Sequence, residues 1–163
     1  MASADLAALD RIMMRLGSVG DEQLEGILAK LLVKLLAKLQ PGTPLQAKLM
    51  EILSHVNRRV KALPRLRLPM ADLLQWLHGD GGGAAAPGPM GQNFGMIYVE
   101  MGWARMEHSE QRSLIALVMQ GLHKRAPRHQ QAILGLLVET MAGSKADLPA
   151  LRDMTAADSK VRC

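Results

Sequence analysis

Residues 21–39, DEQLEGILAKLLVKLLAKL, decide the fold class of this chain. Leucine or isoleucine recurs here in steps of three and four residues, which places an unbroken apolar stripe on one face of a helix. Lys30, Lys34 and Lys38 fall on the opposite face, and the acidic residues gather at the amino-terminal end, as the helix dipole favours. The segment predicts an amphipathic helix that packs its leucines against neighbouring helices, although a basic and apolar helix of this kind can also lie on a membrane surface.

The same spacing predicts helices on both sides of this segment. They cover residues 4–16, 45–62, 70–77, 94–103, 109–125 and 128–141, with Ser109 as an expected N-cap. Within 94–103 the pair Tyr98-Val99 also allows a short strand, but the spacing favours a helix. Prolines separate 21–39 from 45–62 and 109–125 from 128–141, so each of these two pairs is expected to form an antiparallel hairpin. Residues 63–69, LPRLRLP, alternate apolar and basic side chains between two prolines, which predicts an extended connection.

The composition agrees with an all-α fold. The chain has 163 residues, including 27 leucines and 12 methionines but only 17 valines, isoleucines and threonines together, and 2% aromatic residues. Strands favour β-branched and aromatic side chains, whereas leucine and methionine suit helices. Helix hairpins of about 34–40 residues are typical of HEAT and armadillo units. We therefore expect antiparallel helix pairs stacked as a HEAT/armadillo-like α-solenoid fragment.

Two segments interrupt the helical pattern. Residues 79–91, GDGGGAAAPGPMG, are rich in glycine, alanine and proline and predict a flexible loop between first helical repeats at 4–78 and further repeats at 92–142. Residues 143–163 lose the apolar periodicity and are expected to be disordered. The helices near 109–141 are expected to expose an apolar face, because the units of such a stack bury their faces only against neighbours. This exposed face predicts concentration-dependent self-association of the isolated chain.

The chain is basic, with a formal net charge of +5 and a sequence pI near 9.7. Five cations fall within ten residues that contain no acid: Arg58, Arg59, Lys61, Arg65 and Arg67. Cations at a helix carboxyl end offset the helix dipole, so these residues are either structural or a patch that binds an acidic partner. A second group, Lys124, Arg125 and Arg128 with His123 and His129, is equally compatible with a solvated turn.

No pattern of residues indicates an enzyme, a cofactor or a metal site. The sequence GDGGGA at 79–84 fits a dinucleotide-binding pattern, yet it follows a predicted helix and is followed by Pro87, which opposes that assignment. The histidines are scattered, and Glu51, Glu100 and Glu139 each stand alone in the sequence. The single cysteine, Cys163, allows no intrachain disulfide. With no expected signal peptide or membrane span, we expect a cytosolic or nuclear protein.

Several segments together resemble the proteasome adapter and scaffold protein family, whose members are very long HEAT-repeat proteins. They are residues 9–17, 21–39, 48–69 and 94–103, with a weaker likeness at 129–141. The most specific parts are the run from His55 to Pro69, which contains Asn57-Arg58-Arg59, and the run from Ile97 to Gly102. The loop at 79–91 and the residues after 142 are expected to depart from the family.

The resemblance implies a non-catalytic scaffold that associates with the regulatory and core particles of the 26S proteasome in the cytoplasm and nucleus. It implies no small-molecule substrate. From charge alone, the alternative is a basic helical module that binds nucleic acid or an anionic membrane through electrostatics. Binding through phosphates weakens steeply with salt, so salt dependence separates these two hypotheses.

Overall fold

The computed structural model describes residues 2–79, 87–120 and 122–143. Within these ranges the chain is helical and contains no strand, which confirms the all-α prediction. The α-helices are α1 (Ala2–Ser18), α2 (Asp21–Ala37), α3 (Gln46–Ala62), α4 (Met70–His78), α5 (Pro89–Trp103), α6 (His108–Met119) and α7 (Pro127–Gly143), and η1 (Leu122–Lys124) is a short 3-10 helix.

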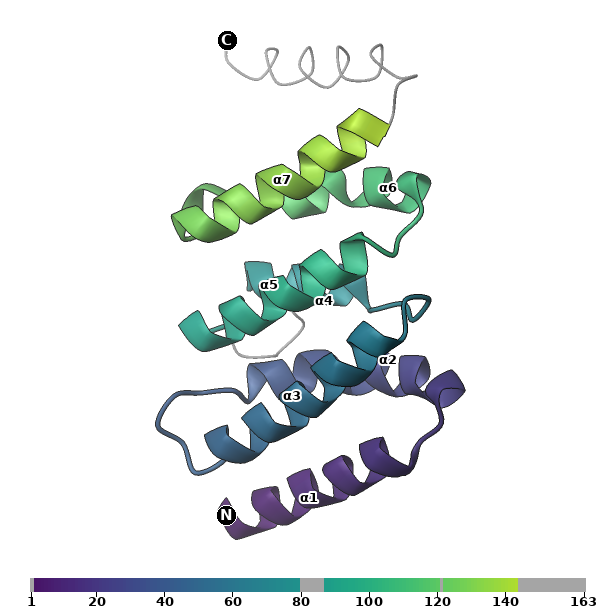
Figure 1. Cartoon of the computed structure of the whole chain (residues 1–163). Coiled ribbons are helices and arrows are strands. Elements are labelled where there is room, and N and C mark those ends of the chain that lie inside the picture. The colour runs from purple at the N-terminus through teal and green to yellow at the C-terminus, as the bar shows by residue number, and fades with distance from the viewer. Residues whose placement is uncertain (1, 80–86, 121, 144–163) are drawn as a thin grey trace.

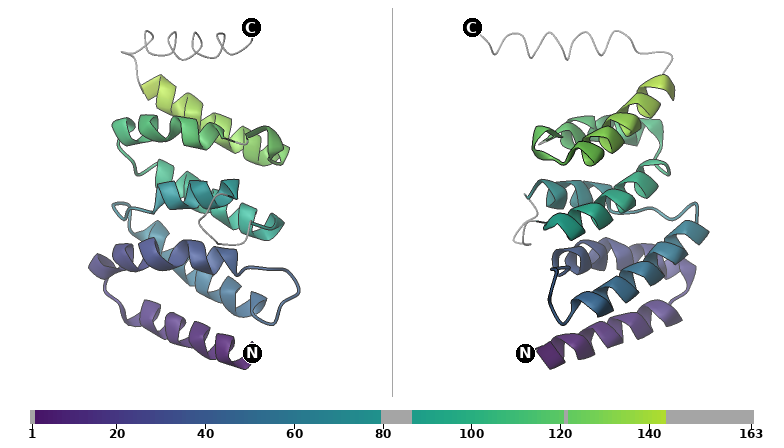
Figure 2. Two further views of the ribbon diagram at one scale, coloured as in Figure 1. Left: turned by 180° about the vertical axis from the view of Figure 1, so that it is seen from behind. Right: turned by 60° about the vertical axis from the view of Figure 1, so that its left-hand side comes forward.

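The helices stack in two layers, as Figure 1 and Figure 2 show. One layer holds α1, α3, α5 and α7, and the other holds α2, α4 and α6. Within the layers α1 contacts α3, α5 contacts α7, and α4 contacts both α2 and α6; across the layers α4 packs on α5 and α6 on α7. Because each antiparallel pair packs mainly on its neighbours, the arrangement is that of a helical-repeat solenoid, as expected.

The leucine stripe of α2 is part of the core, and its lysines lie outside. Leu24, Leu28, Leu32, Leu35 and Leu36 are buried, whereas Lys30, Lys34 and Lys38 are exposed. α3 covers this core with a matching row of buried leucine, isoleucine and valine side chains. The membrane-surface alternative for α2 is therefore not supported, since its leucines already pack inside the protein.

The glycines of α5 allow it to approach α4 closely. A Cβ atom added to Gly91 would lie 3.2 Å from Cη2 of Trp76, and one added to Gly95 would lie 3.0 Å from Cζ3 of the same ring. α5 begins at Pro89, so the loop predicted at 79–91 is too long at its carboxyl end, because Pro89–Gly91 pack as the first turn of a helix. Gly79 ends α4 in the left-handed conformation with φ of 87°, and residues 80–86 lie outside the described residues.

Two further boundaries differ from the predictions. α6 begins one residue before the expected N-cap Ser109, because Glu107 and Glu110 form a capping box at its first turn. The helix predicted to continue to residue 125 ends at Met119, and η1 follows as a single tight turn. The tail expected to be disordered is residues 143–163; Gly143 is the last residue of α7, and residues 144–163 lie outside the described residues.

The connection at 63–69 contains no helix, as predicted. Its N–H groups find partners outside a helical ladder: Leu66 N–H donates to Leu63 O over 3.1 Å, and Arg67 N–H donates to Glu25 Oε2 over 2.9 Å. Leu66 and Leu68 are buried, and the basic residues between and beside them face outward. The buried leucines therefore hold this segment across the edge of the stack, and the basic residues that alternate with them face solvent.

An exposed apolar stripe runs along α7 and carries a prediction about association. Leu134, Val138 and Met141 recur at helical spacing and are 47%, 64% and 47% exposed. We expect sedimentation velocity to show concentration-dependent self-association, and Val138→Glu to weaken it, because a charge opposes burial of the stripe. A monomer at every concentration tested would contradict this prediction.

Candidate functional site

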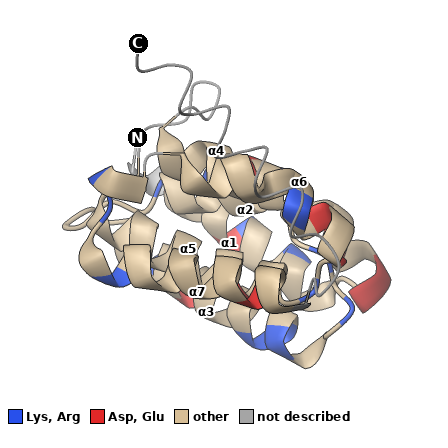
Figure 3. Cartoon of the chain, turned by 90° about the horizontal axis from the view of Figure 1, so that it is seen from above, with Lys and Arg blue, Asp and Glu red and all other residues tan. Residues whose placement is uncertain are grey.

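The basic segment lies at one edge of the solenoid, where the carboxyl ends of α1, α3 and α5 meet the amino ends of α2, α4 and α6. The connections 19–20, 63–69 and 104–107 all cross this edge, which is on the right in Figure 1. Seen along the stack, basic and acidic segments alternate around the helix ends (Figure 3). Because the carboxyl ends of some helices meet the amino ends of others at this edge, cations and anions from different repeats come together here.

Two of the five predicted site residues hold the fold together. The Arg59 guanidinium donates through Nη1 to Leu16 O over 2.7 Å and forms an ion pair with Asp21 through Nη2. These contacts link α3 to the carboxyl end of α1 and the amino end of α2. Arg67 forms an ion pair with Glu110, with 2.8 Å between Nη1 and Oε1, so it links the 63–69 connection to α6. Arg59 and Arg67 therefore take structural roles that the sequence pattern did not separate from binding roles.

The other three cations are exposed and available to a partner. Arg58, Lys61 and Arg65 have exposed side chains, and within the described ranges no hydrogen bond or ion pair holds them. Arg58 and Lys61 lie in the last turns of α3, and Arg65 follows in the connection to α4. We call Arg58, Lys61 and Arg65 the basic edge.

Sequence reasoning missed Arg105, which belongs to the same edge. Its Nη1 donates to Met101 O over 2.7 Å and its Nη2 donates to Val60 O over 2.8 Å. The side chain thus donates to carbonyl groups at the carboxyl ends of both α5 and α3; Val60 O accepts the N–H of Leu63 as well. In the sequence, the position of Arg105 just after the Ile97–Gly102 run was a signal that it could matter. Its place at this edge follows only from the stacking of α3 beside α5.

Substitutions at two neighbouring arginines separate the structural and exposed groups. Arg59→Met is expected to lower the free energy of unfolding by about 1–2 kcal/mol, because the hydrogen bond to Leu16 O and the pair with Asp21 are lost. Arg58→Met is the matched control and is expected to change it by less than about 0.5 kcal/mol. Urea denaturation followed by circular dichroism measures both. Equal losses of stability in the two variants would contradict the assignment of Arg59 to a structural role and of Arg58 to the exposed group.

The second basic group is partly turned inward, so it is more than a solvated turn. Arg125 Nη2 donates to His78 Nδ1 over 2.9 Å, and His78 Nε2 donates to Leu117 O over 2.5 Å. Since the guanidinium can only donate and the carbonyl can only accept, this pattern requires neutral His78. Lys124, Arg128 and His123 remain exposed. The group therefore ties the α6–α7 turn to the end of α4.

Buried His129 gives the fold a pH dependence. Its Nε2 donates to Asn93 Oδ1 over 3.1 Å, and burial, helped by repulsion from Arg128 and Arg125, lowers the pKa of His129 below its usual value of 6.5. As pH falls through 6.5 the unfolded chain binds a proton there before the folded chain does, so the free energy of unfolding decreases. His129→Gln is expected to reduce this decrease between pH 7.5 and 5.5 in thermal unfolding. An unchanged pH dependence would exclude His129 as the cause.

The described residues contain no group of three histidine, cysteine, aspartate or glutamate side chains arranged to hold a metal ion. None of the described helices combines the length and apolarity needed to cross a bilayer. Burial raises the pKa of Tyr98, whose hydroxyl donates to Leu53 O over 3.0 Å, so this hydroxyl serves the core.

Comparison with known proteins identifies similar sequences. The model of the family "Proteasome component ECM29, N-terminal" matches residues 9–161. The human proteasome adapter and scaffold protein ECM29 is 33% identical over 141 residues, which are 84% of this chain and 7% of the human protein. The Drosophila melanogaster proteasome-associated protein ECM29 homolog is 28% identical over 145 residues, 88% of this chain and 7% of that protein. No solved structure matches.

The extent of these matches corrects one expectation. The likeness was expected to end near residue 141, yet the family model continues to residue 161. Low apolar periodicity after residue 142 therefore did not mark the end of the family region. The chain spans about 7% of the length of the curated relatives that it matches.

Proposed function

The chain belongs to the family of the N-terminal region of the proteasome component ECM29, and from this we propose that it is a non-catalytic scaffold module that binds the 26S proteasome. The family match over residues 9–161 carries this proposal. Both relatives are named for association with the proteasome, one as an adapter and scaffold and the other as proteasome-associated.

The architecture supports binding rather than catalysis. A solenoid of helix pairs offers a long, continuous surface to a large partner, and its helices fix exposed side chains at regular intervals. We propose that the basic edge, Arg58, Lys61 and Arg65, is the part of that surface that contacts acidic residues of the proteasome. Arg59 and Arg67, which lie beside these residues in the sequence, are paired with Asp21 and Glu110.

We further propose that binding involves the regulatory and core particles and supports proteasome assembly, stability or quality control. Such a role places the protein in the cytoplasm and nucleus. The names of the relatives support the association in general, and the finer assignment rests on the resemblance of the sequence segments.

Co-sedimentation of the tagged chain with purified 26S proteasomes, at low and at physiological salt, tests the function. The scaffold proposal expects co-migration at both salt concentrations, weaker at physiological salt because salt screens the exposed cations of the basic edge, but still measurable because the rest of a protein–protein interface depends less on salt. Loss of co-migration at physiological salt, with tight binding to DNA or anionic vesicles at low salt, would instead support the electrostatic alternative.

A charge-reversed variant tests the interface. Arg58→Glu, Lys61→Glu and Arg65→Glu together are expected to reduce co-sedimentation at least about tenfold, because three exposed attractions become repulsions. Lys30→Glu, Lys34→Glu and Lys124→Glu make the same change in net charge away from the basic edge and serve as the matched control. Equal losses in both variants would reject the basic edge as the interface.

A further inference from the structure

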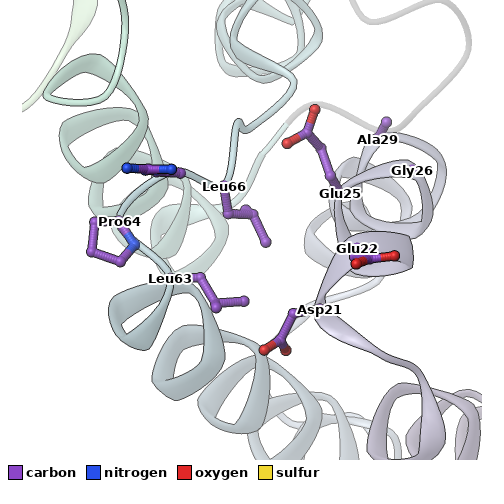
Figure 4. Close-up of a pocket in the computed structure, with 9 residues that line it drawn as sticks. Asp21, Glu22, Glu25, Gly26, Ala29, Leu63, Pro64 and Leu66 are labelled. Carbon is purple, nitrogen blue, oxygen red and sulfur yellow. The ribbon is translucent and has the colours of Figure 1, made fainter.

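A groove of about 700 Å³ lies between the first turns of α2 and the α3–α4 connection, beside the basic edge (Figure 4). The α2 wall carries the carboxylates of Asp21, Glu22 and Glu25, followed by the small residues Gly26 and Ala29. Gly26 has open space where a Cβ atom would stand, so a ligand can come close to this helix.

The opposite wall of the groove is apolar. Leu63 and Leu66 point from the connection towards α2, with Pro64 beside them (Figure 4). Among the described residues, Arg65 is the one cation that lines the groove, and it lies on this wall, across from the carboxylates. The groove therefore joins a wall of carboxylates to a wall of apolar side chains that also carries Arg65, within one open channel.

The three carboxylates differ in the hydrogen bonds and ion pairs that they already make. Asp21 is paired with Arg59, and Glu25 accepts a hydrogen bond from the uncharged backbone N–H of Arg67. Glu22 is exposed, and within the described residues it has no hydrogen bond or ion pair. In a chain of net charge +5, this wall is thus a local negative site that complements a cation.

We propose that the groove docks an extended peptide segment of a partner protein in which a lysine or arginine neighbours a leucine-sized apolar residue. The cation faces Glu22 and Glu25, and the apolar residue enters between Ala29 and the leucines of the connection. The small residues of α2 let the peptide backbone approach the helix. This inference goes beyond the proposed function and does not depend on it, since it specifies the chemistry of a second contact, which adjoins the basic edge at Arg65.

The test measures binding of a short fluorescein-labelled peptide of alternating leucine and lysine to the full chain by fluorescence anisotropy. We expect saturable binding with a Kd on the order of 10–100 μM, and much weaker binding of the peptide in which glutamate replaces lysine. Glu22→Lys is expected to weaken binding about fivefold, and Ala29→Phe, which fills the channel, at least about tenfold.

Two matched variants complete the test. Glu139→Lys makes the same charge change on α7, and Ala116→Phe adds the same ring to an exposed position on α6; both are expected to leave the Kd unchanged. The proposal is overturned if saturable binding is absent, if the acidic peptide binds as well as the basic one, or if Ala29→Phe has no greater effect than Ala116→Phe. The anisotropy measurement contains no proteasome. A failure of the peptide to bind therefore does not change the interpretation of the co-sedimentation experiment.

Discussion

Replacing Trp76 by alanine is expected to lower the free energy of unfolding by about 3–5 kcal/mol, the range for truncating a fully buried aromatic side chain. Trp76 has no exposed surface, and its ring lies under Gly91 and Gly95 where α5 crosses α4. Typical domains have only about 5–15 kcal/mol in total, so the loss is a large part of the stability.

Urea denaturation of the Trp76 variants, followed by far-UV circular dichroism, measures this effect. Trp76→Phe keeps part of the ring contact with α5 and is expected to lose less stability than Trp76→Ala. A loss below about 1 kcal/mol for Trp76→Ala would show that the crossing of α4 and α5 does not depend on this ring.

The second large effect is expected for Gly95→Leu, which adds atoms where the helices are closest. A Cβ atom alone would stand 2.9 Å from Leu77 Cδ2 and 3.0 Å from Trp76 Cζ3, so a leucine forces α5 away from α4. We expect a loss of about 3 kcal/mol or more in the free energy of unfolding.

Gly26→Leu is the matched control for Gly95→Leu, because it makes the same substitution in a helix with open space around the site. It is expected to raise the free energy of unfolding by about 0.5–1 kcal/mol, since leucine favours the helix more than glycine does. The same denaturation experiment compares the two variants. Effects of equal sign would contradict the close approach of α5 to α4.

The helices could be predicted because their apolar residues repeat at a period that only a helix satisfies. α2 and α3 lie close to the predicted ranges, with every leucine of the α2 stripe at least half-buried. The start of α5 could not be predicted, because glycine and proline usually indicate a loop. Here Pro89 suits the first turn of a helix, and Gly91 is buried against Trp76, a contact that depends on tertiary packing.

The cluster of cations can be seen in the sequence, but the contacts that distinguish its members cannot. Local sequence places five cations together between Arg58 and Arg67, but it cannot show which of them meet an anion from another repeat. Asp21 and Glu110, the partners of Arg59 and Arg67, lie about 40 residues away along the chain, and only the stacking of the helices brings them to the same edge. The groove beside this edge was missed for the same reason.

The measurement that tests the central claim most directly is amine-reactive cross-linking of the full chain mixed with purified 26S proteasomes at physiological salt. Mass spectrometry is expected to find cross-links from Lys61, in the basic edge, to proteasome subunits, and few or none from exposed Lys124 at the opposite edge. Absence of any cross-link to a proteasome subunit, with Lys61 as reactive as it is in the free chain, would contradict a proteasome-binding scaffold.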